Sequence, residues 1–236
     1  DPFEKIEIMV NTWPTSRWLA EQIATVNDIS AQVNFPFPNS HLRKFVQLYL
    51  GLDVKRADPW DTNPLTWTII DVLPKLLEFS EAQNLSQWLN TDNSTSNELN
   101  KNKWELAKSI AKTFNSYFLY RPDLINSWWN LGYKSNNLIN ELTAHNKWQP
   151  LLLTLLRERI SSEPICIQIF KVLDQLQRKE KPMKELPSQL QIFGITTLAP
   201  IQIDLIQALS SIIEIKMFLL TPCQDLWKRC QSRRES

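Results

Sequence analysis

The chain has 236 residues, of which 43% are apolar, 22% are charged and only three are glycine. This composition is typical of a folded, helix-rich globular protein and excludes a disordered or fibrous chain. Because 26 basic residues face 25 acidic ones, the chain lacks the overall basicity of many small DNA-binding domains, and any nucleic-acid surface must be local.

The amino-terminal part predicts a strand and two helices. Residues 6–10 are short, apolar and β-branched, as in a strand, and apolar residues then recur at helical spacing from Trp18 to Val26. The run Phe35-Pro36-Phe37-Pro38 can continue neither element, because each proline fixes its own φ and removes a hydrogen-bond donor. The next helix is therefore expected to begin near Asn39 or Ser40.

The middle of the chain predicts helices only. Residues 65–78 form the first of them, and Pro74 is expected to kink or divide it. A second helix over 81–89 is expected to open with Ser80 and Gln83 as a capping box. Residues 91–97 predict a loop. Further helices are predicted over 98–120, briefly after Pro122, over 148–159 and over 165–177.

Beyond a charged linker over 178–187, the pattern changes to strand, helix and strand over 190–195, 201–209 and 213–220, which predicts a βαβ unit with a parallel pair. We expect the strand over 6–10 to pair in parallel with 190–195. The fold class is then α/β and predominantly helical, with one lobe formed by residues 1–51 and 186–236 and a helical insertion over 52–185.

Motifs for catalysis are scarce. The phosphate-binding pattern G-x-x-x-x-G-K-[ST] is absent, since the three glycines lie far apart. Glu214 and Lys216 match the E-x-K spacing of some metal-dependent nucleases, although an alternating polar strand face supplies the same pair by default. Three cysteines without C-x-x-C spacing and two isolated histidines, His41 and His145, argue against a metal site and favour a reducing cytosol. His41 and His145 are each expected at the surface or as a capping residue.

The helix over 98–120 is the most informative stretch. Its apolar residues step by three and four, whereas most of its lysines lie off that stripe, beside small hydrogen-bonding side chains. Such a face suits a nucleic acid, and it also suits plain solvation. Trp18, Trp67 and Trp104 fall in apolar stripes and are expected in the core, while one residue among Trp13, Trp128 and Trp129 is expected to be exposed.

Four segments together, in this order and spacing, resemble the RecC family, the gamma subunit of exodeoxyribonuclease V. They are Phe35-Pro36-Phe37-Pro38, Trp67 with Leu73-Pro74-Lys75-Leu76-Leu77-Glu78, Tyr117-Phe118-Leu119-Tyr120-Arg121-Pro122-Asp123, and Phe193-Gly194-Ile195 through Thr221-Pro222-Cys223.

The resemblance implies a fragment cut at both ends from the amino-terminal region of a longer subunit that is built like superfamily-one helicases, with P-loop-type topology but without a working ATPase. It implies a DNA-binding, non-catalytic role in double-strand-break repair and recombination, in which the region guides single-stranded DNA and scans it for the Chi signal. The beta and alpha partner subunits would supply ATP- and Mg-dependent helicase and nuclease activity, so the fragment itself needs no cofactor. The implied location is the bacterial cytoplasm.

The resemblance also carries DNA-facing positions. Arg121 is expected to grip a phosphate or a guanine edge, and Phe37 to act as an apolar wedge or stacking surface. The positions that read bases in the best-known members here hold Lys112, Thr113, Asn115 and Ser116, and Arg43 stands where an aromatic residue is usual. Two other hypotheses remain open: a metal-dependent nuclease centred on Glu214 and Lys216, and a helical protein-interaction module without a nucleic-acid role.

Overall fold

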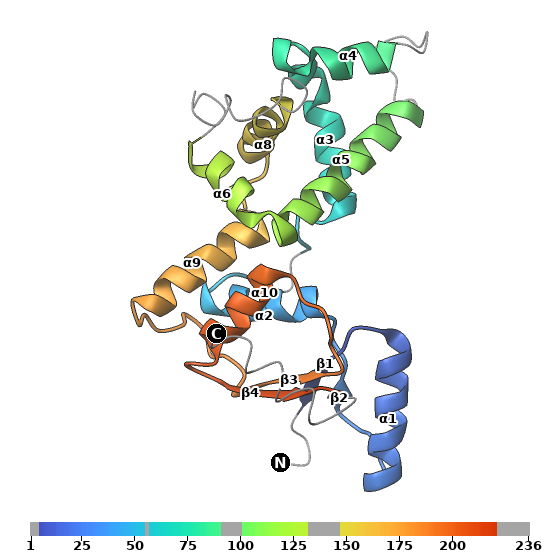
Figure 1. Ribbon diagram of the computed structural model, residues 1–236, viewed down its shortest axis with the longest axis vertical. Coiled ribbons are helices and arrows are strands. Elements are labelled where there is room, and N and C mark those ends of the chain that lie inside the picture. The colour runs from blue at the N-terminus through green and yellow to red at the C-terminus, as the bar shows by residue number, and fades with distance from the viewer. Residues whose placement is uncertain (1–4, 55–56, 91–100, 132–146, 221–236) are drawn as a thin grey trace, which may run out of the picture. The chain divides into compact units, whose positions relative to one another are not determined.

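The computed structural model describes residues 5–54, 57–90, 101–131 and 147–220 and divides into two compact units (Figure 1). The first unit comprises Asp1–Leu52, Lys181–Leu198 and Gln202–Ser236, and the second comprises Asp53–Glu180 and Ala199–Ile201. Within the described residues, none of the helices has the length and hydropathy that a membrane-spanning segment requires.

The first unit contains a parallel sheet whose strand order is β2-β1-β3-β4. The expected pairing of the first strand with the one after the helical segment is confirmed, because Ile8 aligns with Gln191 and Met9 with Ile192. The predicted parallel βαβ pair of β3 and β4 is confirmed as well. The strands are β1 (Ile6–Met9), β2 (Val33–Asn34), β3 (Gln189–Phe193) and β4 (Glu214–Phe218).

Helices cover both faces of this sheet: α1 (Trp13–Asn27), α2 (Pro38–Tyr49) and α10 (Pro200–Leu209) (Figure 1). Ile8, Val10 and Leu19 form a buried cluster, which places α1 on one face. Side chains alternate along a strand, so Glu7 points to the other face, where it pairs with Lys44 of α2. A hydrogen bond of 2.7 Å from Gln202 to Asn39 joins α10 to α2.

The two ends of α2 are held by different means. Pro38 begins the helix at its first position, where its fixed φ fits and its missing N–H costs nothing. At the other end Gly51 takes a φ of 72°, and a Cβ there would lie 3.0 Å from the Sδ of Met183. The backbone N–H of Met183 donates to the carbonyl of Tyr49. The return of the chain after the linker is therefore fixed to the end of α2.

The second unit is helical throughout its described residues. Its centre is Trp60, which is 2% exposed and meets the rings of Phe118 and Trp129 edge to face. The Trp60 indole N–H donates to the carbonyl of Ser162 at 2.9 Å. The elements are α3 (Thr62–Leu77), η1 (Ser80–Ala82), α4 (Gln83–Asn90), α5 (Lys101–Tyr120), α6 (Pro122–Leu131), α8 (Trp148–Arg159) and α9 (Ile165–Gln177).

Local expectations differ from the structure at three places. Pro74 was expected to kink or divide its helix, and it does not divide α3, which runs unbroken past it with the proline exposed. Ser80 caps nothing, because it lies inside the 3-10 turn and its hydroxyl bonds to Glu81. The short strand β2 was missed, since two residues, Val33 and Asn34, carry no readable period. The loop expected over 91–97 lies outside the described residues.

The tryptophans that are buried and those that are exposed differ in part from the sequence expectation. Trp18 and Trp67, expected in the core, are 51% and 56% exposed, and Trp104 is half-buried. Trp13 is 71% exposed, whereas Trp128 and Trp129 are buried, so the expectation that one residue of this second group is exposed is confirmed. Helical spacing alone thus overstated the buried apolar stripe of α1 and α3.

Candidate nucleic-acid interface

Three of the residues expected to contact DNA lie exposed on the outer face of α5 or directly after it. The helix buries Ala107, Ile110, Ala111, Phe114 and Phe118 on one stripe. Lys112 and Ser116 lie exposed off that stripe, and Arg121 is exposed directly after the last turn. Lys101, Lys108 and Lys112 lie on the exposed side of α5, where Glu105 is the acidic residue among them, so this side is locally positive although the chain is nearly neutral.

Asn115 occupies a different position from its neighbours, because its amide is turned into the protein. The amide nitrogen donates to the backbone carbonyl of Trp60 at 3.1 Å and to that of Ala111 at 3.0 Å. Both amide hydrogens are then in use, and only the carbonyl oxygen remains for a further partner. Asn115 therefore positions α5 against the Trp60 segment.

The hydroxyls on this face bond back to their own helix. Ser116 donates to the carbonyl of Lys112 at 3.2 Å, and Thr113 donates to that of Ser109 at 3.0 Å. Such bonds use the donor and leave the hydroxyl lone pairs available. Donors toward an anion must then come from Lys112 and Arg121, and the hydroxyls can accept from base amino groups.

Phe37 and Arg43 belong to the first unit, at the start and within α2. Phe37 is 37% exposed and meets Trp13 edge to face, with ring centroids 6.0 Å apart. Ser40 and His41 both donate to the carbonyl of Phe37, which fixes its backbone. Arg43 is half-buried on the same helix. Sequence reasoning left Trp13 unassigned, although a tryptophan directly after a strand was a signal for an exposed ring.

Trp13 and Phe37 lie near the carboxyl end of β1. The chain leaves β1 toward β2 on one side and joins β3 on the other, and ligands of open parallel sheets bind outside the carboxyl ends at such a reversal. The link from β1 and the first turn of α1 read Asn11-Thr12-Trp13-Pro14-Thr15 and contain no glycine and no lysine. Pro14 lacks an N–H, so this turn cannot close amides around a phosphate as a P-loop does.

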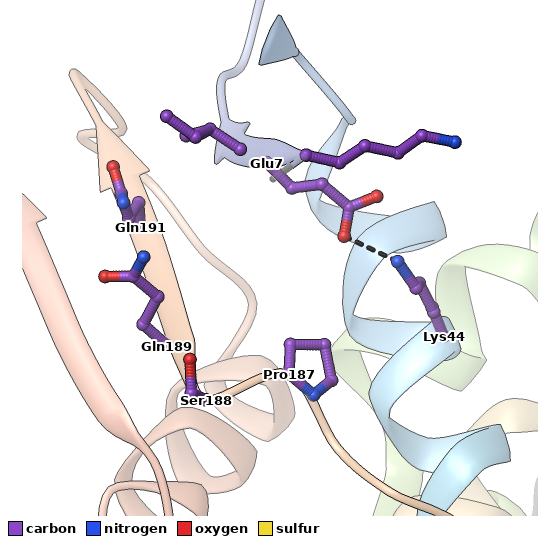
Figure 2. A pocket seen from close by; sticks show the side chains of 8 residues that line it. Glu7, Lys44, Pro187, Ser188, Gln189 and Gln191 are labelled. Atoms are coloured by element: carbon purple, nitrogen blue, oxygen red, sulfur yellow. Dashed lines mark hydrogen bonds and ion pairs between the residues drawn. The ribbon is translucent and has the colours of Figure 1, made fainter. Parts of the chain in front are cut away.

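A hollow of about 270 Å³ lies at the opposite, amino ends of β1 and β3 (Figure 2). It opens where β1 leaves β3: Ile8 and Met9 pair with β3, whereas Ile6 and Glu7 pair with β2. The ion pair of Glu7 and Lys44 spans one wall, as Figure 2 shows. The lining consists of Lys5, Ile6, Glu7, Lys44, Pro187, Ser188, Gln189 and Gln191.

The remaining candidates for chemistry do not assemble a catalytic cluster. Glu214 and Lys216 pair with each other at 3.2 Å on the exposed strand β4, and the described residues contain no group of three His, Cys, Asp or Glu side chains placed to hold a metal ion. The expectation for His41 was wrong, because its side chain is 3% exposed. Burial lowers the pKa of His41 to about 4; Glu7 raises this pKa and Lys44 lowers it, both by smaller amounts. His145 lies outside the described residues.

The fold and this site define a mixed α/β protein with a helical second unit and a helix that carries exposed lysines. Its sequence matches the model "RecC, N-terminal domain" over residues 1–236. The chain belongs to the RecC N-terminal domain family, and the resemblance seen in the sequence is confirmed.

Several curated proteins named "RecBCD enzyme subunit RecC" are similar to the chain. Those of Haemophilus influenzae and Escherichia coli are 26% and 27% identical over 96% of the chain, and that of Mycolicibacterium smegmatis is 27% identical over 99%. The matched parts make up 21%, 20% and 20% of these proteins. The chain thus spans about a fifth of the length of the curated relatives it matches.

Proposed function

We propose that this chain is the DNA-guiding, non-catalytic part of a RecBCD-type helicase-nuclease complex. Its role would be to receive one unwound strand during double-strand-break repair and recombination, while partner subunits supply ATP hydrolysis and strand cleavage. The observation that carries the proposal is the exposed basic face of α5, ending in Arg121, on a chain of the RecC family.

Rigidity of the basic helix supports this role. The buried stripe of α5 and the bonds of Asn115 to the Trp60 segment hold the helix in place. Lysine and arginine side chains on a fixed helix can neutralise successive phosphates without a large ordering cost. Phosphate contacts of this kind position a strand, and neighbouring polar side chains then meet base edges.

The absence of a P-loop pattern supports a helicase-like sheet without ATPase activity. The turn after β1 is where a phosphate-binding loop would stand in such a fold, and here it holds Trp13 and Pro14. We infer that the aromatic pair of Trp13 and Phe37 contributes an apolar contact to the strand at this edge. Reading of a Chi-type signal would then rest on the polar positions of α5 in the second unit.

Replacement of Arg121 tests the proposal. Arg121→Ala is expected to weaken the binding of a labelled single-stranded oligonucleotide and to reduce the slope of log K against log salt by about 0.7, as for one lost phosphate contact. Arg178→Ala is the matched control, because this exposed arginine lies directly after α9 and pairs with Asp174 at 2.8 Å. Equal binding by both variants and the parent chain would overturn the proposal.

A further inference from the structure

Two tryptophans of the second unit form a surface feature that the core does not need. Trp67 of α3 and Trp104 of α5 lie with ring centroids 4.9 Å apart and planes tilted by 57°. Trp67 is 56% exposed. A large ring held against a second ring keeps its orientation, and its free surface is still open to a ligand.

The core of α3 is complete without this pair. The buried stripe of the helix consists of Leu65, Thr66, Ile69, Val72, Leu73 and Leu76, and Trp67 lies off it. At 100° per residue, Trp104 falls between the buried stripe of α5 and its solvent-exposed side. Trp67 therefore lies on the solvent side of α3, and Trp104 lies at the border of the packed interior of α5.

Lysines continue the surface next to the indoles. Lys101, Lys108 and Lys112 share one side of α5, since seven and four residues are close to whole turns. Lys101 pairs with Glu105 at 3.8 Å. Lys108 and Lys112 are exposed, and within the described part of the chain neither forms an ion pair. Lys108 and Lys112 can therefore hold phosphates.

We propose that Trp67 and Trp104 form a base-stacking platform for single-stranded DNA, with the lysine row of α5 holding the backbone beside it. This site rests on the proposed function and adds to it a place where bases are held by their faces, independent of sequence. Aromatic rings beside a basic track are the means by which proteins bind single strands without reading them. A protein partner fits less well, because lysine is depleted at the centre of protein interfaces.

The test compares two oligonucleotides of equal length, one of thymidines and one abasic, which carry the same phosphates but differ in bases. With the full 236-residue chain, Trp67→Ala is expected to lose roughly 5- to 150-fold in affinity for the thymidine strand, the range for one stacked base. Affinity for the abasic strand should stay unchanged. Trp67→Phe, which keeps a ring, should restore part of the loss and guards against a folding defect.

Lys108→Ala separates charge from stacking, because it should lower the affinity for both strands by the same factor and make the salt dependence shallower. Trp18→Ala serves as the control for an exposed tryptophan elsewhere. If Trp67→Ala leaves thymidine binding intact while Arg121→Ala lowers it, the platform is wrong and the proposed function stands. An equal loss on both strands also overturns the platform. Binding of neither strand by the parent chain removes both proposals.

Discussion

Replacement of Asn115 by alanine should destabilise the second unit even without DNA. The side chain donates to the carbonyls of Trp60 and Ala111 at 3.1 and 3.0 Å. The Ala111 carbonyl keeps its helical partner after the change, whereas the Trp60 carbonyl, beside an indole that is 2% exposed, loses this donor. A partly buried acceptor left without its partner costs about 1–3 kcal/mol in the free energy of unfolding.

Urea unfolding followed by tryptophan fluorescence measures this cost, since Trp60, Trp128 and Trp129 are buried in the same unit. Each kcal/mol should also lower Tm by roughly 2–4 °C at this size. Ser116→Ala is the matched control one residue along the helix: its hydroxyl is exposed and bonds only within α5, so its change should stay within about 0.5 kcal/mol. Equal stability of the two variants would refute the positioning role of Asn115.

Three further changes follow from buried groups. His41 has a pKa of about 4 in the folded protein against an ordinary value of 6.5, so the free energy of unfolding falls as the pH drops below 6.5. In urea titrations the parent chain should lose about 2 kcal/mol between pH 7 and pH 5 relative to His41→Gln. Parallel pH profiles of the two proteins would contradict this. Burial raises the pKa of the Cys166 thiol to about 12. In a variant with Cys223 and Cys230 replaced by serine, a thiol reagent at pH 8 should therefore react with Cys166 only when the chain unfolds. Rapid labelling of the folded chain would contradict this. Trp60→Ala should cost about 3–5 kcal/mol by urea unfolding, and a cost below about 1 kcal/mol would show that the second unit does not depend on this ring.

Much of the fold could be read from local patterns. Helices α8 and α9 have the bounds predicted from apolar spacing, because both bury apolar residues at helical spacing along their length. The pairing of β1 with β3 was predicted because two short strand patterns flank an otherwise helical stretch. Strand β2 could not be read, since two residues give no periodicity.

Whether a residue is buried depends on neighbours that are distant in the sequence, and not only on whether the residue is apolar. Trp18 and Trp67 follow helical spacing, yet they lie beyond the width of the stripe that neighbouring elements cover. His41 looked like a surface residue, but the packing of α2 against the sheet buries it beside Phe45. Such outcomes depend on residues far away along the chain, which a local window does not contain.

Some features of the candidate site could be predicted from the sequence, and others required the structure. Basic residues on α5 and at Arg121 could be predicted from charge and helical spacing. The inward turn of Asn115 could not, because its partner Trp60 is 55 residues away in the chain. The pairing of Trp67 with Trp104 depends on how α3 and α5 pack, so it too required the structure.

Fluorescence anisotropy of a labelled single strand, titrated against the chain across a salt series, examines most directly whether a locally positive surface guides DNA. The expected result is a linear fall of log K with log salt, with a slope near −2 or steeper for the phosphates that Lys108, Lys112 and Arg121 neutralise, and an intact strand throughout. A salt-independent affinity, no binding at low salt, or cleavage of the strand in the presence of Mg²⁺ would contradict it.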